Sequence, residues 1–286
     1  MYIQCHEEEY LPCIWFDKDG KDAAQFYIDI FGDGKITTDT QMVVTFELSG
    51  QKFLALNGGP EVKPNPAVSF MAVLEDKDEL ENIWNKLSDG GKVLMQLDKY
   101  EWSEKYGWIQ DKFGVSWQLY FGKVNDDVHG QKFIPTYMFT QEYNGRAEEA
   151  LIFYVKLFEN SKLDGVMKHQ EGEMKGLVMH AQFVLDDCVM AVMDGGNGPD
   201  FQFSWGNSMF IECETQEEID RFWNAFADGG EESQCGWIRD KFGVWWQVVP
   251  KQLIVWMTDP QLAPKVSAAF YKMKKIDIET LRKAIA

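Results

Sequence analysis

The sequence predicts an α+β protein in which one domain occurs twice in tandem and is followed by C-terminal helices. Three observations support this fold class: a long internal repeat, short apolar runs typical of strands, and amphipathic helical stripes at matching places in both copies. We place domain one at residues 1–125, domain two at 132–250 and the helical tail at 251–286, with a polar linker at 123–132. Each copy reads as two similar βαβββ modules.

The repeat is clearest in two segments of equal length. Residues 107–119 read GWIQDKFGVSWQL and residues 236–248 read GWIRDKFGVWWQV, so ten of thirteen positions match at an offset of 129. Shorter segments recur as well: Phe26-Tyr27 as Phe153-Tyr154, Trp84 as Trp223, and Asn57-Gly58-Gly59 as Asp194-Gly195-Gly196. The offset changes only between predicted elements. Insertions confined to loops indicate a folded repeat.

The strands are predicted from runs of apolar and β-branched residues bounded by turn residues. They lie at residues 11–16, 43–48, 53–56, 68–73 and 115–121 in copy one, and at 134–139, 179–185, 189–193, 209–213 and 244–249 in copy two. Each predicted helix carries apolar residues at helical spacing, which would line one buried stripe. The stripes are Ala23, Phe26, Tyr27, Ile30 and Phe31; Leu80, Ile83, Trp84 and Leu87; Ala147, Leu151, Tyr154 and Phe158; and Ile219, Phe222, Trp223 and Phe226.

The helix ends carry their own signals. Asn144 is placed to cap the first helix of copy two. Thr215 with Glu218 forms a capping-box pattern, and Asp76 with Glu79 resembles one. The second helix of each copy ends in Asp-Gly-Gly, where a glycine can adopt the left-handed conformation. The tail beyond domain two reads as one or two amphipathic helices.

The composition excludes several classes of function. The net charge is −18 and the isoelectric point is about 4.6, so the chain repels nucleic acid and anionic membranes. No apolar run is long enough for a transmembrane helix, and the acidic N-terminus lacks the pattern of a signal peptide. Five cysteines without a CxxC pair favour a reducing compartment, so we predict a cytoplasmic protein.

With these motifs in place, the chain resembles the vicinal oxygen chelate superfamily of glyoxalases and bleomycin-resistance proteins. It is most similar to the PhnB-like group labelled "3-demethylubiquinone-9 3-methyltransferase". The segments that carry the resemblance are Thr215-Gln-Glu-Glu-Ile-Asp220, Cys235-Gly-Trp-Ile-Arg-Asp240, Gly243-Val-Trp-Trp-Gln247 and Met179-His-Ala-Gln-Phe183. The resemblance implies two glyoxalase-like domains, each of paired βαβββ modules that form a curved mixed sheet around a small-molecule site. It also implies an intrachain pseudo-dimer, and leaves a homodimer of whole chains open.

The same resemblance sets out what a metal site would need. Metal-using members carry His or Glu on the first and last strands of each module. The last-strand position holds Gln118 in copy one and Gln247 in copy two, the first strands contain no histidine, and a further ligand strand offers Ser69. Amide and hydroxyl groups bind divalent ions weakly, so we predict no metal and no cofactor. The sequence also lacks the glycine-rich strand-to-helix turn that a methyl donor would need.

The ligand-binding candidates are polar or aromatic residues near the predicted site: Asn57, Trp108, Gln118, His180, Asp194, Trp237 and Gln247. His180 is the one histidine on a predicted strand, and it is either a polar contact for a ligand or a hydrogen-bonded structural residue. The two glutamines either face the ligand or cap a neighbouring strand. The two tryptophans offer a stacking wall, with core packing as the alternative. Asn57 and Asp194 read chiefly as turn residues, and no catalytic residue is assigned.

Two classes of function follow from these residues. We predict a protein that binds a small organic molecule in a metal-independent glyoxalase-like site. The alternative is a superfamily enzyme of the lyase or dioxygenase type with a degenerate or recruited metal site, so catalytic activity stays open. A third reading makes one copy a structural partner of the other. No nucleic-acid or membrane partner is expected.

Overall fold

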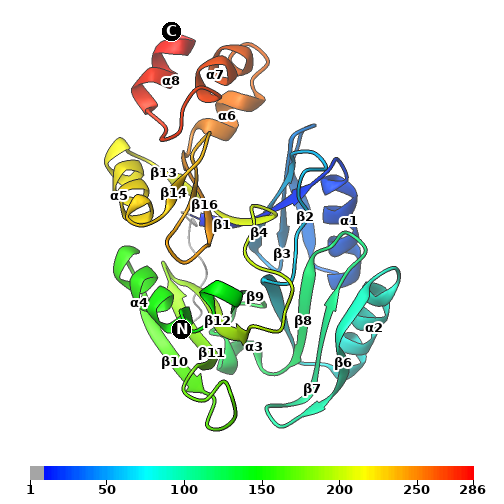
Figure 1. Ribbon diagram of the computed structural model, residues 1–286. Coiled ribbons are helices and arrows are strands. Elements are labelled where there is room, and N and C mark those ends of the chain that lie inside the picture. The colour runs from blue at the N-terminus through cyan, green and yellow to red at the C-terminus, as the bar shows by residue number, and fades with distance from the viewer. Residues whose placement is uncertain (1–9) are drawn as a thin grey trace. The chain divides into compact units, whose positions relative to one another are not determined.

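The structure is a computed structural model in which residues 10–286 are described (Figure 1). Their contacts divide these residues into two compact units. Unit one comprises residues 14–207, and unit two comprises residues 10–13 and 208–286. The units differ from the sequence repeats, because unit one continues into the first module of the second repeat. The domain boundaries drawn from the sequence remain a prediction.

The first repeat contains two βαβββ modules. The first module consists of β1 (Tyr10–Phe16), α1 (Gly20–Phe31), β2 (Gly34–Asp39), β3 (Val43–Leu48) and β4 (Gln51–Asn57). The second consists of β5 (Val68–Leu74), α2 (Lys77–Ser88), β6 (Lys92–Tyr100), β7 (Ser103–Gln110) and β8 (Ser116–Phe121). Every strand and helix placed by the sequence in this repeat is confirmed. β2, β6 and β7 complete the modules.

The second repeat has the same order. After α3 (Val124–Asp127), which lies in the predicted linker, come β9 (Phe133–Thr140), η1 (Gln141–Tyr143), α4 (Ala147–Leu157), β10 (Lys162–Lys168), β11 (Val178–Leu185) and β12 (Cys188–Gly196). Its second module consists of β13 (Asn207–Cys213), α5 (Gln216–Ala227), β14 (Glu231–Glu232), β15 (Trp237–Arg239) and β16 (Trp245–Pro250). The tail forms α6 (Leu253–Thr258), α7 (Ala263–Phe270) and α8 (Ile278–Ile285). The described tail therefore has three helices, where the sequence predicted one or two.

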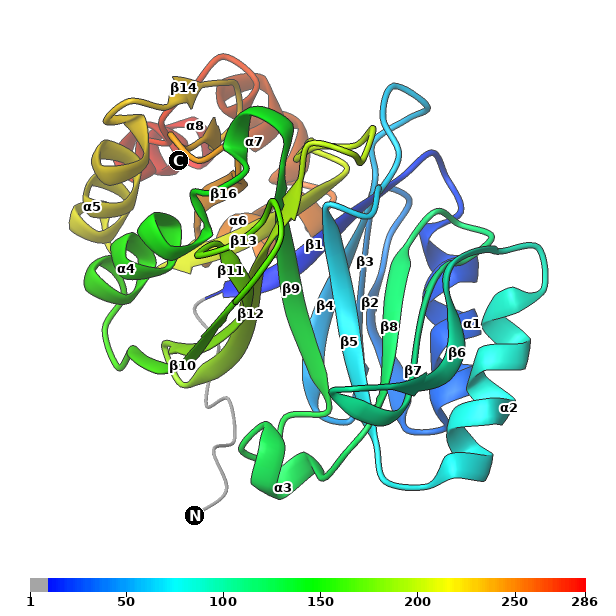
Figure 2. The same cartoon turned by 60° about the horizontal axis from the view of Figure 1, so that its bottom comes forward.

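The strands form two mixed sheets of eight strands, which confirms the α+β class. One sheet lies wholly in unit one, with the order β10-β11-β12-β9-β5-β8-β7-β6. At its centre β5 pairs antiparallel with β9 (Figure 2). In this pair Ser69 lies opposite Thr136. This sheet therefore combines the second module of repeat one with the first module of repeat two.

The remaining strands are divided between the units. In unit one, β4, β3 and β2 pair in that order, and both pairings are antiparallel. In unit two the order is β14-β15-β16-β13, with β13 parallel to β16. β1 contributes residues 10–13 to unit two and residues 14–16 to unit one.

Helices α1 and α2 bury their apolar stripes in one core of unit one, where they lie side by side (Figure 2). The large aromatic side chains of this core include Tyr27, Phe31, Phe46, Phe53, Phe70, Trp84, Trp117 and Phe133. The ring centroid of Trp117 lies 5.0 Å from those of Tyr27 and Phe31, so α1 packs against β8. Buried aromatic rings of this size account for much of the apolar area removed from water.

A buried aspartate explains the repeated thirteen-residue motif. In unit one, Asp111 Oδ1 accepts hydrogen bonds from the backbone N–H groups of Phe113 and Val115, at 2.8 and 3.0 Å. Its Oδ2 accepts from Trp117 Nε1 at 2.9 Å and from Tyr27 Oη at 2.8 Å. The aspartate thus shapes the turn before β8 and also holds the core tryptophan.

Unit two repeats this arrangement. Asp240 Oδ1 accepts from the N–H groups of Phe242 and Val244, at 2.8 and 3.1 Å. Its Oδ2 accepts from Trp246 Nε1 at 2.8 Å. The spacing Asp-Lys-Phe-Gly-Val-x-Trp therefore serves the turn and the core, which is why both copies share it.

The cap predicted at Asn144 is wrong. Helix α4 begins at Ala147 with Arg146 as its N-cap residue, so Asn144 lies too early in the chain to cap it. The Asn144 side chain instead accepts a hydrogen bond from Gly196 N at 2.9 Å. Asp194 takes over the cap, because its Oδ1 accepts from two N–H groups at the start of α4, at 2.7 and 3.3 Å.

The other helix ends follow the sequence. The Thr215–Glu218 capping box of α5 forms both of its hydrogen bonds, and Asp76 accepts from two N–H groups of the first turn of α2. Gly90 and Gly229, which follow α2 and α5, have φ angles of 75° and 79°. These left-handed conformations are those expected of a helix-ending glycine.

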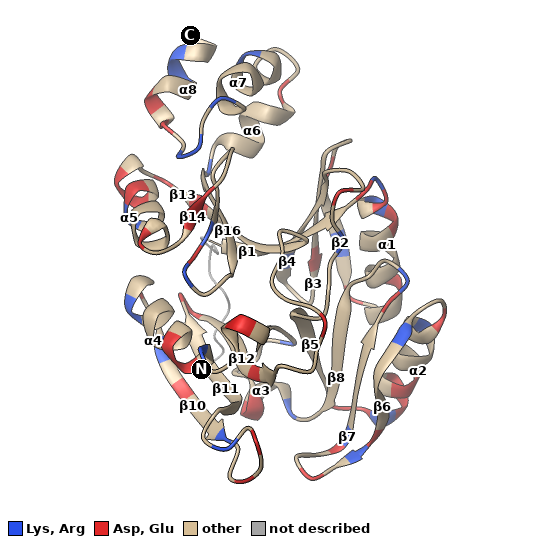
Figure 3. Ribbon diagram, viewed as in Figure 1, with Lys and Arg blue, Asp and Glu red and all other residues tan. Residues whose placement is uncertain are grey.

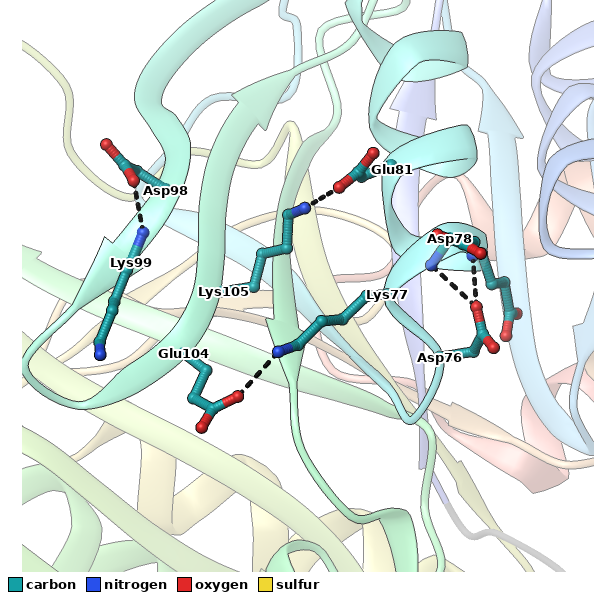
Figure 4. Close-up of polar contacts among 9 residues, drawn as sticks. Asp76, Lys77, Asp78, Glu81, Asp98, Lys99, Glu104 and Lys105 are labelled. Atoms are coloured by element: carbon teal, nitrogen blue, oxygen red, sulfur yellow. Dashed lines mark hydrogen bonds and ion pairs between the residues drawn. The ribbon is translucent and has the colours of Figure 1, made fainter.

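Charged residues are frequent on the helices and on edge strands (Figure 3). On α2, Lys77 pairs with Glu104 of β7 at 2.8 Å, and Glu81 pairs with Lys105 (Figure 4). The three central strands of the unit-one sheet, β5, β8 and β9, contain no charged residue. In the described part of the chain, no helix has the length and apolar character needed to cross a membrane.

Candidate ligand-binding site

The two faces of the unit-one sheet differ in character. Phe70 and Trp117 point into the core with α2. Their neighbours Ser69 and Gln118 therefore point to the opposite face, because successive side chains of a strand alternate. The strand register extends this opposite face to Thr136 on β9. We call the face that carries Gln118 and Ser69 the site face.

Gln118 is the polar centre of the site face. Its buried side chain donates from Nε2 to Ser69 Oγ at 2.7 Å and accepts at Oε1 from Tyr106 Oη at 2.8 Å. Burial raises the pKa of Tyr106, so its hydroxyl stays a neutral donor. A carboxamide offers two N–H donors and two lone pairs on oxygen. One donor and one acceptor of Gln118 are therefore left over for a ligand.

A row of hydroxyl side chains crosses the middle of the sheet beside Gln118. Thr136, Ser69 and Ser116 lie opposite one another on β9, β5 and β8, and all three are buried. Ser116 Oγ accepts from Trp108 Nε1 at 2.7 Å. Trp108 lies opposite Gln118 in the register, so this bond holds its indole ring on the site face. The row is polar but carries no charge.

His180 also lies on the site face, but on β11, near the opposite edge of the sheet from Gln118. It is opposite Met167 of β10, while Met193 of β12 is opposite Met138 of β9. The imidazole is half-buried, and within residues 10–286 nothing hydrogen-bonds to it. Burial lowers the pKa of His180 below its ordinary value. The ring is therefore neutral at pH 7.

Gln118 and His180 share a face but are not neighbours. Three strands separate β8 from β11, and adjacent strands lie about 4.8 Å apart, so the two residues are roughly 20 Å apart across the sheet. Beyond Trp108 the face is bordered by residues 197–206, where the Phe201 ring lies 6.4 Å from that indole. Its other end is bordered by Val124 of α3, which packs on a small apolar cluster around Met71.

Unit two carries the same polar pair. Gln247 Nε2 donates to Ser208 Oγ at 2.9 Å. The adjacent Trp246 stacks on Phe226 of α5 at 4.6 Å, so Gln247 points away from the helix. Trp237 lies opposite Gln247 in the register and shares its face. The structure thus brings together both candidates of this unit.

A buried cysteine completes the polar group of unit two. The buried Cys13 thiol lies beside the side chains of Gln247 and Ser208. Burial raises the pKa of Cys13 to about 12, so the sulfur is a neutral thiol. A protonated thiol is a weak nucleophile, and Cys13 therefore acts as a packing and hydrogen-bonding residue.

The last two candidates lie away from both polar pairs. Asn57 Oδ1 accepts from Gly20 N at 2.9 Å, where α1 begins. Asp194 alternates with Met193 on β12 and so points toward α4, and its Oδ2 accepts from Val178 N at 2.9 Å. Each of them fixes the start of the first helix of its repeat.

The residues present do not fit a divalent metal site of the superfamily type. The positions in question hold Thr136, Ser69 and Gln118 in unit one, and Cys13, Ser208 and Gln247 in unit two. Neutral hydroxyl, amide and thiol groups are poor ligands for such ions compared with carboxylate and neutral imidazole. In residues 10–286, no three His, Cys, Asp or Glu side chains are grouped to hold a metal ion.

Part of this network is not apparent from the sequence. The repeat offset does identify Ser208 as the counterpart of Ser69. Trp84 and Trp223 are 139 residues apart, and Ser69 and Ser208 are separated by the same number (208 − 69 = 139). Tyr106 gave no signal, since its strand was not placed and the corresponding residue of the second repeat is a cysteine. The methionines around His180 are not marked in the sequence either, because apolar residues on a strand are typical of a core.

A family model gives the first comparison with known proteins. The model described as 3-demethylubiquinone-9 3-methyltransferase matches residues 8–120 and again residues 131–249. The two matches span most of the chain and coincide with its two repeats. No curated protein sequence matches the chain.

Solved structures give the second comparison. A PhnB protein from Bacillus cereus is 29% identical, and the match covers 39% of this chain and 98% of that protein, with a TM-score of 0.38. Glyoxalase I from Zea mays is 14% identical over 83% of this chain and 91% of its own, with a TM-score of 0.55. A point mutant of the same maize enzyme is 13% identical over 88% and 96%, with a TM-score of 0.56. The likeness to glyoxalase I shows the fold alone. The chain belongs to the 3-demethylubiquinone-9 3-methyltransferase family and consists of two tandem glyoxalase-like domains of the vicinal oxygen chelate fold.

Proposed function

We propose that the site face of unit one binds a small organic molecule without the help of a divalent metal. One observation carries the proposal: Gln118 is a buried, neutral amide that keeps one donor and one acceptor unused on a face without central charges. Buried polar groups are normally saturated by hydrogen bonds. The unused capacity of Gln118 therefore calls for a partner that brings both an acceptor and a donor.

The surroundings of Gln118 favour a flat, largely apolar ligand. Trp108 offers a ring whose orientation is fixed by its bond to Ser116. Met71 lies opposite Gln118 on the neighbouring strand β5, and Met138 is half-buried on β9 of the same face; flexible thioether side chains adapt to ligands of different shape. Ligand sites of this kind combine apolar walls with a few polar groups. An uncharged heteroaromatic amide or lactam suits the site best.

The pairing of the modules supports an intrachain pseudo-dimer as the assembly. The central β5–β9 pair joins one module from each repeat, so the chain supplies both halves of its own site face. We also place the protein in the cytoplasm. The acidic charge and the buried thiols of Cys13, Cys188 and Cys213 support a reducing compartment without acidic or nucleic-acid partners.

Methyl NMR of protein labelled at the methionine methyl groups tests the proposal. Nicotinamide, an uncharged heteroaromatic amide, and uncharged lactams serve as probes. Binding is expected to shift the signals of Met71 and Met138, while that of Met209, buried on the helix side of unit two, stays in place. Signals are assigned by single Met→Leu substitutions.

Gln118→Leu should weaken probe binding by about 1–3 kcal/mol, or roughly 5- to 150-fold, because it removes the anchoring amide. Gln96→Leu is the matched control, since Gln96 is exposed on β6. Near-ultraviolet circular dichroism checks that both variants fold. Probe shifts that persist unchanged in Gln118→Leu would refute the role of Gln118, and no shift from any probe would refute the ligand class.

A further inference from the structure

We propose that the site face carries a second, separate site for a soft monovalent metal ion, Cu(I), held by Met167, His180 and Met193. These residues lie on the neighbouring strands β10, β11 and β12. They share the face of Gln118 but lie on strands near the opposite edge of the sheet. The inference therefore does not rest on the organic ligand proposed above.

The strand register brings the three side chains into one row. Met167 lies directly opposite His180 in the β10–β11 pair. In the β11–β12 pair Ala181 lies opposite Val192, so the next pair along is His180 with Met193. Directly opposed residues have Cβ atoms about 5 Å apart and point to the same face. Two thioethers thus flank one imidazole, and all three can reach an ion above β11.

The chemistry of this row matches Cu(I) better than a divalent ion. Thioether sulfur is a soft ligand that selects Cu(I), and neutral imidazole also binds copper. All three donors are uncharged, which suffices for a monovalent ion but leaves a divalent charge poorly compensated. No carboxylate shares the row. The set therefore differs from the His and Glu ligands that the superfamily resemblance implies elsewhere on the sheet.

Two further observations point to a ligand at this row. The half-buried His180 ring has no hydrogen-bond partner among residues 10–286, although a buried polar group without a partner costs stability. Met167 is 49% exposed, so a large apolar side chain faces solvent beside that ring. Met138 borders the row on β9, where its sulfur would lie 2.7 Å from a Cβ atom added to Gly195. A glycine at that position leaves room for this thioether.

Silver(I), a redox-stable substitute for Cu(I), is the probe for the test. The protein carries Cys5→Ser and Cys235→Ser, because thiols bind silver strongly, and Cys13, Cys188 and Cys213 are buried. One equivalent of Ag(I) should shift the methyl signals of Met167 and Met193. The signal of Met42 should stay in place.

Isosteric substitutions then assign the ligands. Met167→Leu and Met193→Leu should each weaken Ag(I) binding at least about tenfold, since each removes one sulfur while keeping the packing volume. Met42→Leu is the matched control, because Met42 is also 49% exposed but lies on another strand connection. A chromophoric Cu(I) chelator used in competition repeats the measurement with copper under reducing conditions.

The outcomes separate this proposal from the organic-ligand site. Unmoved Met167 and Met193 signals, or silver affinity unchanged in both Leu variants, would overturn the metal site. Gln118→Leu should leave silver binding intact, because Gln118 lies about 20 Å away across the sheet. A substitution that abolishes nicotinamide binding but keeps silver binding would therefore affect only the organic-ligand site at Gln118. A substitution that abolishes silver binding but keeps nicotinamide binding would affect only the metal site at Met167, His180 and Met193.

Discussion

At the scale of single residues, the buried polar groups of this chain fall into two kinds. In Asp111 and Asp194 both carboxylate oxygens accept hydrogen bonds, all of them from backbone amides or core side chains. We call such groups saturated. Gln118 and His180 are not saturated by the described residues. Saturated groups stabilise the fold, whereas unsaturated groups on a charge-poor face are suited to a ligand.

His180 gives a prediction about pH. Burial lowers its pKa, so the folded state binds a proton less readily than the unfolded state, whose histidine titrates near about 6.5. The stability that depends on the neutral ring is complete above that unfolded value and is lost as the pH falls through the folded value. His180→Gln cannot take up a proton and lacks this dependence.

The measurement compares thermal midpoints of the parent and His180→Gln at about pH 7.5 and about pH 5.5. The parent should lose more stability than the variant on going to the lower pH. His169→Gln, a substitution in the loop after β10, controls for the general effect of acid. Equal losses in the parent and in His180→Gln would show that the ring is not shielded from protons.

At the scale of elements, the start of α4 depends on Asp194. Its carboxylate accepts from Gly145 N, Ala147 N and Val178 N, and it is 5% exposed. Asp194→Ala should lower the free energy of unfolding by about 3 kcal/mol, because it leaves buried N–H groups without an acceptor. Urea unfolding followed by far-ultraviolet circular dichroism measures the change.

Two further substitutions sharpen that experiment. Asp194→Asn keeps one oxygen acceptor and should lose about half as much stability. Asp200→Ala, on the exposed loop after β12, should change the free energy by less than about 0.5 kcal/mol. A loss in Asp194→Ala no larger than in Asp200→Ala would mean that water replaces the carboxylate at the helix start.

Most elements could be predicted because their apolar patterns are strong. Helices α1, α2, α4 and α5 and the central strands follow from buried stripes and apolar runs in the sequence. β2 and β10 could not be placed: Gly34–Asp39 and Lys162–Lys168 are polar and largely exposed edge strands, so no hydrophobic period marks them. The cap at Asn144 failed because an aspartate distant in sequence lies closer to the helix start.

Some residues of the candidate site could also be predicted from the sequence. Gln118 and Gln247 stood out because the repeat preserves them next to core tryptophans, and alternation then requires that they face away from the core. Their partners are residues on other strands, such as Ser69 and Tyr106, and only the register brings these together. The row around His180 depends on register across β10, β11 and β12 in the same way.

At the scale of the whole molecule, the eight-stranded sheet of unit one is built from strands of both repeats and not from one repeat alone. β5 of repeat one pairs with β9 of repeat two, and the site face is shared between them. A duplicated sequence offers two solutions, in which modules pair within a repeat or between repeats. The sequence pattern is the same in both cases, so only the strand pairing of the structure distinguishes them.

This cross-repeat pairing predicts the behaviour of a divided chain. Residues 1–125 and 126–286, expressed separately, should self-associate, because each half exposes an unpaired edge of β5 or β9. Expressed together, they should form a stable complex of one copy of each half. Light scattering coupled to size exclusion measures the mass, which is 33.0 kDa for one full chain.

As a control, a protease site inserted in the linker at 123–132 is cut after folding, and the two pieces should stay together at that mass until denatured. Two separately expressed halves that are each folded and monomeric would contradict the pairing of β5 with β9, because neither half could then need the other to complete its central sheet.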